Sequence, residues 1–264
     1  MIKRTILLVL VLLFLSSPAA LSAYVLKDTW HRSFDVVEGV EFILRNVNGG
    51  IEIEGWERNE IDVSAEIKIK APSKSKAREL LEKLTFEVEA GSDRVRIDTE
   101  RPRIRQVGLL GSIFGDKTTI TIGYTVKVPP RTILDIKNTN GGISVDAVEG
   151  RFDFRTVNGS ITITSFSGEG EASTVNGAIE CFIDAFPAGG DLELKTVNGG
   201  IELALPEGAG GTLDARTANG RIGLDLDLRE TVRIKRSSIK GVIGDGTGTI
   251  YLKTVNGGIS IVPR

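Results

Sequence analysis

The sequence predicts an all-β protein: a β-solenoid-like stack of coils of about 18–22 residues with one helix in its N-terminal half. Three observations support this class. A short Asn-Gly motif recurs along the chain, apolar residues alternate with polar ones on both sides of it, and the composition combines 31 glycines with only 6% aromatic residues. Period-two alternation is typical of strands with one buried face, and frequent glycine is typical of tight turns.

The repeats share an Asn-Gly pair followed two residues later by Ile. The asparagines are Asn48, Asn140, Asn158, Asn176, Asn198, Asn219 and Asn256, and the glycines are Gly49, Gly141, Gly159, Gly177, Gly199, Gly220 and Gly257. A degenerate copy, Ser238 to Ile243, fills the one gap, so that from Asn140 onward copies follow one another at 16 to 22 residues. Such a period fits one solenoid coil, but it also fits one two-stranded hairpin.

An antiparallel hairpin meander is therefore the alternative fold, because Asn-Gly between alternating strands is a strong hairpin signal. A meander leaves a long apolar face that needs a cover, and no amphipathic helix follows Gly142 to provide one. In a solenoid the equivalent asparagines stack about 4.8 Å apart and, pointing inward, form a hydrogen-bonded structural ladder. Each glycine then occupies a corner that requires positive φ.

The N-terminus has the pattern of a signal peptide. Lys3 and Arg4 precede an apolar run from Ile6 to Leu15, and small residues follow as far as Ala23. Because ten apolar residues are too few for a spanning helix, we expect residues 1–23 to be cleaved and the mature protein to be extracytoplasmic, in the periplasm, on the cell surface or secreted. A retained N-terminal anchor is the alternative.

The next part, residues 24–132, holds the first repeat and the one expected helix. Residues 61–70 alternate as a strand, and residues 74–84 form a helix that Ser73 caps, with Ala77, Leu80, Leu81 and Leu84 in one apolar stripe. Strands are expected at 86–89, 95–99 and 120–128, and an apolar loop at 101–116. Residues 133–264 form the repeat solenoid, which we expect to be one continuous domain with residues 24–132.

These features resemble the putative-adhesin family, uncharacterised β-strand-repeat envelope proteins of bacteria and archaea. The resemblance rests on Val47-Asn-Gly-Gly-Ile51 with Gly55-Trp56 after it, the helix residues 77–84, the strand Tyr124 to Pro129 and the later Thr-Val-Asn-Gly run. It implies a right-handed β-solenoid-like fold, a location outside the cytoplasm and no known catalysis.

Catalytic, metal-binding and cofactor-binding residues are not expected. The single His31 and the single Cys181 are far apart in sequence, and Cys181 occupies a repeat position that Ile163 and Leu203 also fill. Carboxylate pairs occur at Glu52 and Glu54, Glu169 and Glu171, and Asp225 and Asp227. Since they alternate with apolar residues, we expect them on a solvated face and not in a cleft. The glycine-rich stretch 244–248 has neither phosphate-loop nor calcium-loop residues, so turns are the better interpretation.

Interaction is the expected function. The charge balance of 33 basic and 35 acidic residues implies no basic patch and no nucleic-acid partner. The leading hypothesis is a non-catalytic structural or adhesin-like module that binds an envelope protein or a surface polysaccharide. A surface-glycan-binding or glycan-cleaving solenoid and an envelope-stress signalling partner are the alternatives.

Two segments are candidate contacts. The loop side chains Val107, Leu109, Leu110, Ile113 and Phe114 form a candidate partner or membrane contact. The last strand, residues 259–262, ends almost at the chain end, and its edge is expected to allow end-to-end self-association.

Overall fold

The computed structural model describes residues 23–102 and 118–264. The described residues form strands and one α-helix, α1 (Lys74–Glu82). In chain order the strands are β1 (Tyr24–Asp35), β2 (Val40–Arg45), β3 (Ile51–Gly55), β4 (Glu60–Ala71), β5 (Thr85–Ala90), β6 (Arg94–Glu100), β7 (Thr119–Val128), β8 (Thr132–Lys137), β9 (Ile143–Asp146), β10 (Glu149–Arg155), β11 (Ile161–Asn176), β12 (Ile179–Ala185), β13 (Asp191–Asn198), β14 (Ile201–Leu205), β15 (Gly211–Asn219), β16 (Ile222–Leu224), β17 (Glu230–Lys235), β18 (Ser238–Ile243), β19 (Thr249–Asn256) and β20 (Ile259–Pro263). The predicted all-β class is confirmed.

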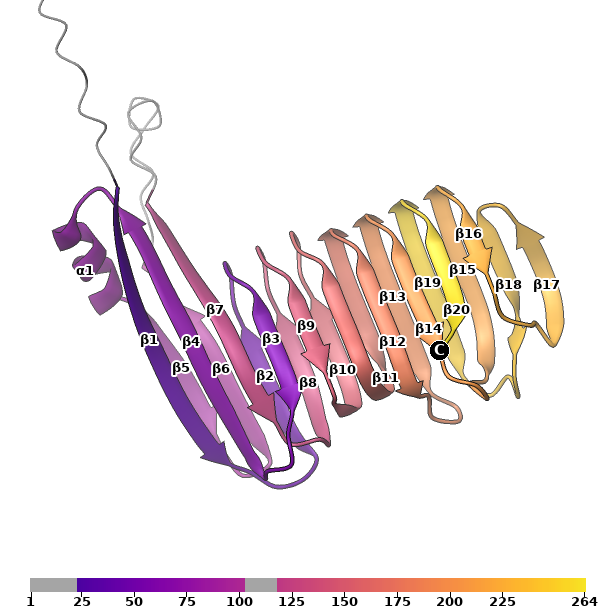
Figure 1. The fold of residues 1–264 in the computed structure, drawn as a ribbon, viewed down its shortest axis with the longest axis horizontal. Coiled ribbons are helices and arrows are strands. Elements are labelled where there is room, and N and C mark those ends of the chain that lie inside the picture. The colour runs from indigo at the N-terminus through magenta and orange to yellow at the C-terminus, as the bar shows by residue number, and fades with distance from the viewer. Residues whose placement is uncertain (1–22, 103–117) are drawn as a thin grey trace, which may run out of the picture.

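The strands lie in two layers that face each other along an elongated molecule (Figure 1). We name them the first sheet and the second sheet. The spatial order of the first sheet is β5, β6, β2, β8, β10, the C-terminal half of β11, β13, β19, β15, β18, β17. The spatial order of the second sheet is β1, β4, β7, β3, β9, the N-terminal half of β11, β12, β14, β20, β16.

Successive coils pair in parallel and in register, which decides between the two predicted folds. Ile161 is opposite Ile179, and Ile179 is opposite Ile201, all in parallel strands. Hairpins joined by two-residue Asn-Gly turns would instead pair neighbouring strands antiparallel. The Asn-Gly motifs are thus corners between the two sheets of a solenoid, and the meander alternative is wrong.

The order of the coils in space differs from their order in sequence at both ends of the molecule. The coil of β2 and β3 lies between strands β6 and β7 on one side and β8 and β9 on the other. The C-terminal coil of β19 and β20 lies between the coil of β13 and β14 and the coil of β15 and β16. Strand 259–262 is therefore paired on both sides, and the expected free edge at the chain end is wrong.

The degenerate repeat at 238–243 is not a coil of the parallel stack. It forms β18, which pairs antiparallel with β15, so that Lys240 is opposite Asp214. Strand β17 then pairs antiparallel with β18 and ends the first sheet. The absence of the Asn-Gly pair removes the tight corner here, and the chain makes a hairpin on the end of the stack.

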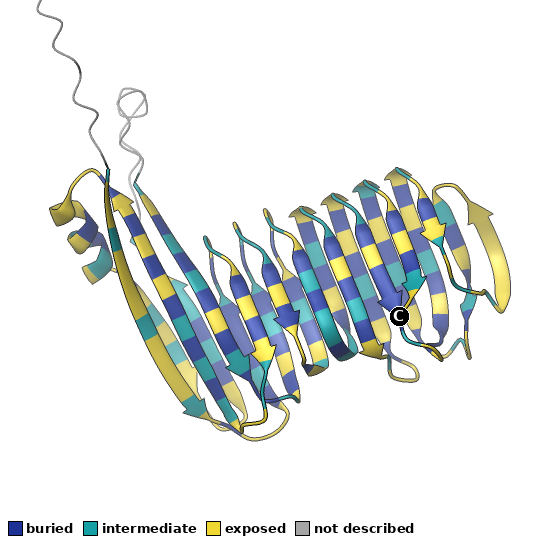
Figure 2. Cartoon of the chain, viewed as in Figure 1, coloured by how far each residue is buried: buried dark blue, intermediate teal, exposed yellow. Residues whose placement is uncertain are grey.

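The core runs the length of the molecule between the two sheets, and alternate residues of most strands point into it (Figure 2). The Ile that follows each Asn-Gly pair contributes one layer of it, since these seven side chains are at most 7% exposed: Ile51, Ile143, Ile161, Ile179, Ile201, Ile222 and Ile259. Helix α1 packs against β1 and β4 at the N-terminal end, with Ala77 and Leu80 buried. Ser73 caps it by accepting a hydrogen bond from the Lys76 amide at 3.2 Å. Within residues 23–102 and 118–264, no helix has the length and apolar character needed to cross a bilayer.

Candidate functional site

The seven predicted asparagines line one corner of the solenoid and form a continuous side-chain ladder. In six of them Nδ2 donates to the Oδ1 of the asparagine one coil nearer the N-terminal end, at 2.7–2.8 Å, and in the first, Asn48, it donates to the Ile120 carbonyl at 3.2 Å. The spatial order is Asn48, Asn140, Asn158, Asn176, Asn198, Asn256, Asn219. The asparagines point outward, and all but the half-buried Asn48 are exposed. The expected inward orientation is wrong, because the alternation is interrupted at the corner: after a buried Thr174 both Val175 and Asn176 are exposed, and the same holds in the neighbouring coils.

The residue two positions before each asparagine builds a second, buried ladder that the sequence did not lead us to expect. Thr156, Thr174, Thr196, Thr217 and Thr254 are each at most 7% exposed. Their Oγ1 atoms donate at 2.8–3.0 Å to the corner glycine carbonyl of the preceding coil. The feature of the sequence that indicates this ladder is the Thr at the first position of each Thr-Val-Asn-Gly copy. In the first two copies Asn46 and Asn138 take its place, and Asn138 Nδ2 donates to the Gly49 carbonyl at 2.8 Å.

The corner glycines are required by close stacking more than by backbone conformation. Only Gly49 and Gly141 of the seven have positive φ in the left-handed range, at 122° and 147°. At the other corners a Cβ would meet the carbonyl oxygen of the neighbouring corner glycine at 1.9–2.2 Å, which no Cβ can occupy. The expected positive φ is thus wrong at five corners, and steric exclusion by the next coil explains the glycine there.

Arg101 closes the buried ladder at the N-terminal end and also contacts the backbone of Asn48. Its Nη2 donates to Asn46 Oδ1 at 2.7 Å and to the Asn48 carbonyl at 3.3 Å. Burial lowers the pKa of this guanidinium. No repeat pattern marks Arg101, so sequence reasoning placed it only at the start of a loop.

An exposed apolar row lies between the two ladders in sequence. Val47, Val157, Val175 and Val197 are each about 40% exposed. Thr139, Val255 and Ala218 occupy the same position in the other copies. The ladder corner therefore presents a methyl group beside an amide group at each coil, from a β-branched residue in every copy but that of Ala218.

The outer face of the first sheet carries charges in rows that run along the molecule. The cation row consists of Arg45, Lys137, Arg155, Lys195, Lys253 and Arg216, in neighbouring coils except where Ser173 takes one place. The acid row, two residues earlier in each strand, consists of Asp135, Asp153, Glu171, Glu193 and Asp214, with Tyr251 between the last two. Like charges thus lie side by side, an arrangement that destabilises a sheet unless opposite charges are near.

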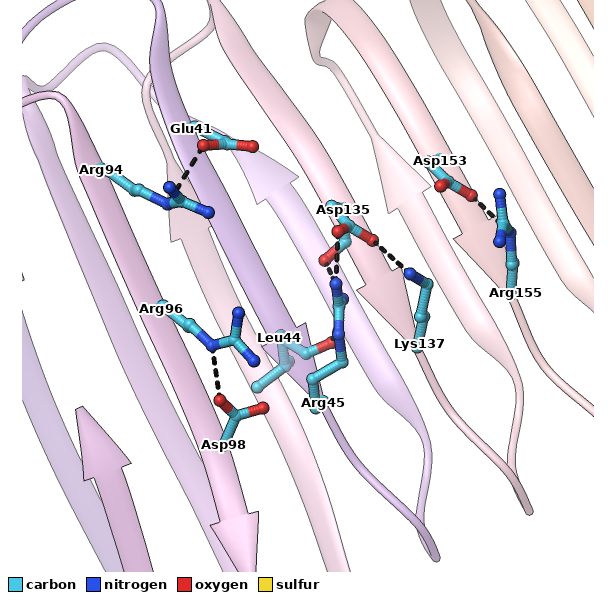
Figure 3. Close-up of polar contacts among 10 residues, drawn as sticks. All are labelled: Glu41, Leu44, Arg45, Arg94, Arg96, Asp98, Asp135, Lys137, Asp153 and Arg155. Carbon is cyan, nitrogen blue, oxygen red and sulfur yellow. Dashed lines mark hydrogen bonds and ion pairs between the residues drawn. The ribbon is translucent and has the colours of Figure 1, made fainter. Parts of the chain in front are cut away.

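Opposite charges of the two rows pair with one another. Figure 3 shows Arg155 beside Asp153, with Nε 2.9 Å from Oδ1. Lys195 pairs with Glu193, and Arg216 donates to Asp214 at 2.7 Å. Lys253 makes no ion pair with any described residue. The sequence signal for these rows is an acid-apolar-base triplet before several Thr-Val-Asn-Gly copies, such as Asp153-Phe154-Arg155.

Asp135 in the acid row forms ion pairs with two cations, Arg45 and Lys137 (Figure 3). Arg45 pairs with its carboxylate and donates from Nη1 to its backbone carbonyl at 2.8 Å. Lys137 Nζ lies 3.7 Å from its Oδ1. Burial on its own would raise the pKa of Asp135, but the hydrogen bond and charge of Arg45 outweigh it and lower the pKa.

The residues considered for chemistry lie apart from one another. Cys181 is fully buried between Ile163 and Leu203, and burial raises the pKa of its thiol to about 12. His31 lies in β1, where Nε2 is 2.8 Å from an Asp62 oxygen. No group of three possible metal ligands occurs among residues 23–102 and 118–264.

The carboxylate pairs and tryptophans are also dispersed. Glu52 and Glu54 are exposed on β3, Glu169 and Glu171 lie in β11, and Asp225 and Asp227 are exposed after β16. Trp30 stacks on Phe86 at 4.6 Å between ring centroids. The Trp56 ring has Arg58 at 4.9 Å and Lys127 at 5.6 Å from its centroid. The candidate contact residues Val107, Leu109, Leu110, Ile113 and Phe114 lie outside the described residues.

The paired sheets, the corner ladders and the rows of like residues define a repeat solenoid whose variable part is its outer surface. Residues 133–262 match the family model described as Toastrack DUF4097. This match confirms the resemblance to the putative-adhesin family over the repeat half of the chain.

Several solved structures are similar to the chain, and no curated protein matches it. A putative cell adhesion protein from Clostridium sporogenes is 11% identical with a TM-score of 0.49, covering 91% of this chain and 100% of its own. A putative adhesin from Bacteroides fragilis is 11% identical with a TM-score of 0.39, covering 89% and 97%. A putative lipid binding protein from Parabacteroides distasonis is 13% identical with a TM-score of 0.30, covering 89% and 97%. The fold itself is defined by the parallel, in-register pairing of the coils.

Proposed function

We propose that the protein is a non-catalytic, adhesin-like interaction module of the cell envelope that binds an anionic surface polysaccharide along the first sheet. The leader-like N-terminus supports a location outside the cytoplasm. The observation that carries the proposal is the cation row beside the ladder corner. Neighbouring coils place these cations about 4.8 Å apart, so one extended polyanion contacts several of them at once.

The acid row sets the strength and selectivity of this binding. It pairs with most of the cations and keeps the face near neutral, so a short anion gains little by binding one exposed cation. A polymer gains from many weak contacts on one rigid surface. Because exposed charges are screened within about 8 Å at physiological ionic strength, the binding should weaken as salt is added.

A charge-removal variant tests the proposal. Lys195, Lys253 and Arg216 lie in three adjacent coils, and the natural Ser173 shows that serine is accommodated in this row. The triple variant K195S/K253S/R216S should lose binding to polysaccharide extracted from the envelope, measured by sedimentation or calorimetry. The matched control T162S/E180S/E202S, on the outer face of the second sheet, should bind as the parent does. Equal binding by all three proteins would refute the proposed surface.

An envelope protein is the alternative partner, and an envelope-stress signalling role is one form of it. Protease treatment of intact envelopes separates the two partner classes. Binding that survives the treatment and falls after removal of the polysaccharide supports the proposal. Binding that the protease abolishes identifies a protein partner, which would then be captured by pull-down from intact envelopes.

A glycan-cleaving solenoid has less support from the side chains. A general acid needs a raised carboxyl pKa. In the part of the chain that the structure describes, the carboxyl groups with shifted pKa values are Glu79, Asp135 and Asp245, and all three shift downward. Incubation with the bound polysaccharide should release no reducing sugar, and release at a rate proportional to protein concentration would establish the enzyme instead.

End-to-end self-association would have to use the outer strands of the sheets. Strand β17 has a bulge between Thr231 and Arg233. Strand β1 turns Asp28 and Arg32 to the same face as the buried Ile67 and Val63. Bulges and inward-facing charges both oppose pairing with another edge. We therefore propose that the working surface is the side of the stack, and light scattering should report a monomer at all protein concentrations.

A further inference from the structure

The Asn-Gly pairs are chemically the most reactive peptide units of this chain. The backbone nitrogen of Gly attacks Cγ of the preceding Asn, a nitrogen to carbon bond forms in a five-membered succinimide, and the side-chain nitrogen leaves as ammonia. Water then opens the succinimide to Asp or isoaspartate. Glycine favours the attack because it has no side chain to shield its nitrogen. The reaction needs a mobile Asn side chain and an accessible Gly N–H.

The inner coils hold both reactive groups in hydrogen bonds. Asn176 is representative, because its Nδ2 donates to Asn158 and its Oδ1 accepts from Asn198, both at 2.8 Å. The N–H of Gly177 donates to the Asn198 carbonyl at 3.1 Å. The same backbone bond is made by Gly49, Gly141, Gly159 and Gly199. Attack at these sites requires at least three hydrogen bonds to open together.

Asn219 is different because it occupies the last position of the ladder. Its Nδ2 donates to Asn256 Oδ1 at 2.8 Å, but its own Oδ1 accepts no hydrogen bond from a described residue. The Gly220 N–H likewise has no acceptor among the described residues. The segment at Arg236 and Ser237 lies beside this corner, but its carbonyls accept from other residues. The Ser237 carbonyl accepts from the Thr217 N–H and the Arg236 carbonyl from the Ile222 N–H, on either side of the Asn-Gly pair. The exposed Asn219 side chain is therefore held by one hydrogen bond.

We propose that Asn219-Gly220 is a site of spontaneous deamidation, selected from the seven Asn-Gly pairs by its place at the end of the stack. The product carboxylate has no N–H to give to Asn256 Oδ1, so two oxygens face each other and the last ladder bond is lost. Asn256 then becomes the last bonded position. The Gly257 N–H has no acceptor among the described residues, so Asn256 is the next site, and modification spreads inward from this end.

Mass spectrometry of the intact folded chain after incubation at mildly alkaline pH tests the site. Trypsin separates the relevant pairs, since cleavage after Arg216 and Arg221 releases Asn219, and cleavage after Lys195 and Lys253 isolates Asn198 and Asn256. Each rate is divided by the rate of the same pair in denatured protein, which removes the influence of the flanking residues. Asn219 should react at least about tenfold faster than Asn198 on this scale, because inner pairs must break additional hydrogen bonds first. Equal normalised rates at Asn219 and Asn198 would overturn the proposal.

The variant Asn219→Asp tests the spread. It places the product carboxylate at the end of the ladder in every molecule, and the normalised rate at Asn256 should rise while the rate at Asn198 stays unchanged. A control, Val232→Ala on the exposed strand β17, should leave both rates unchanged. If Asn256 reacts no faster in Asn219→Asp than in the control, inward spreading is wrong and deamidation is confined to Asn219.

Discussion

Asn219 donates a hydrogen bond of 2.8 Å to Asn256, a residue 37 positions later in the chain that lies deeper in the stack. The C-terminal coil of β19 and β20 therefore lies between the coil of β13 and β14 and the coil of β15 and β16, although both of these precede it in sequence. Asn256 in turn donates to Asn198 at 2.8 Å. The chain terminus is thus an inner element of the fold, and the end of the stack is formed by residues 211–243.

The order of the coils sets the order of the stability effects at this end of the ladder. Asn256 has a ladder partner on each side, whereas Asn219 has one. Asn256→Ala should lower the free energy of unfolding by about 1–2 kcal/mol, and Asn219→Ala by about half as much. Urea denaturation followed by circular dichroism measures both. A larger loss at Asn219 than at Asn256 would contradict the observed coil order.

The coil architecture could be predicted from the sequence because every repeat contains the same local pattern. The order in which the coils stack could not be predicted. Asn-Gly followed by Ile specifies a corner and a buried side chain in every copy. Near-identical copies, however, form equally good contacts with several neighbours, so the repeats leave open which coil stacks on which. Lys240 in place of Asn is the local sign that residues 238–243 leave the pattern, and this one substitution does not separate a weak repeat from a hairpin.

A second prediction separates steric exclusion from backbone conformation at the corners. A Cβ on Gly177 would lie 2.1 Å from the Gly159 carbonyl oxygen, while a Cβ on Gly50 would meet no atom within 4 Å. Gly177→Ala should destabilise the protein by about 1–3 kcal/mol, as overpacking of a dense interior does. Gly50→Ala should be close to neutral. Thermal unfolding of the two variants checks this, and similar melting temperatures would show that the stack can open to admit a methyl group.

The buried threonine ladder gives a third prediction. Thr174 is 4% exposed, and its Oγ1 donates to the Gly159 carbonyl at 2.8 Å. Thr174→Val keeps the shape but removes this donor from a partly buried carbonyl, which should cost about 1–3 kcal/mol. Thr174→Ser restores the donor and should recover most of the loss in chemical denaturation. If Thr174→Val were as stable as the parent and Thr174→Ser were less stable, the methyl group of Thr174, and not its hydroxyl, would stabilise the corner.

The charged rows were recoverable from the sequence only in part. Asp153 and Arg155 stand two apart, which places them on one face of a strand, and the triplet recurs before later repeats. That these side chains continue into rows depends on parallel in-register pairing, which the repeats indicated. The ion pair of Arg45 with Asp135 could not be foreseen, because it joins the first coil to a coil 90 residues later.

Asp135 carries the last prediction, a dependence of stability on pH. Its pKa in the folded protein is below the ordinary value of 3.8, so folding favours the ionised form. The stabilisation by Arg45 is complete above pH 3.8 and is lost as the pH falls through the lower folded pKa. In Asp135→Asn this acid-induced loss should be smaller than in the parent, while stability near neutral pH should be lower. Urea midpoints measured from neutral pH down to below pH 3.8 give both curves.

Glu171→Gln, at an exposed position of the same row, is the matched control and should follow the parent. Parallel curves for the parent and Asp135→Asn would show that the ion pair of Asp135 with Arg45 makes no contribution to the pH dependence of the free energy of unfolding.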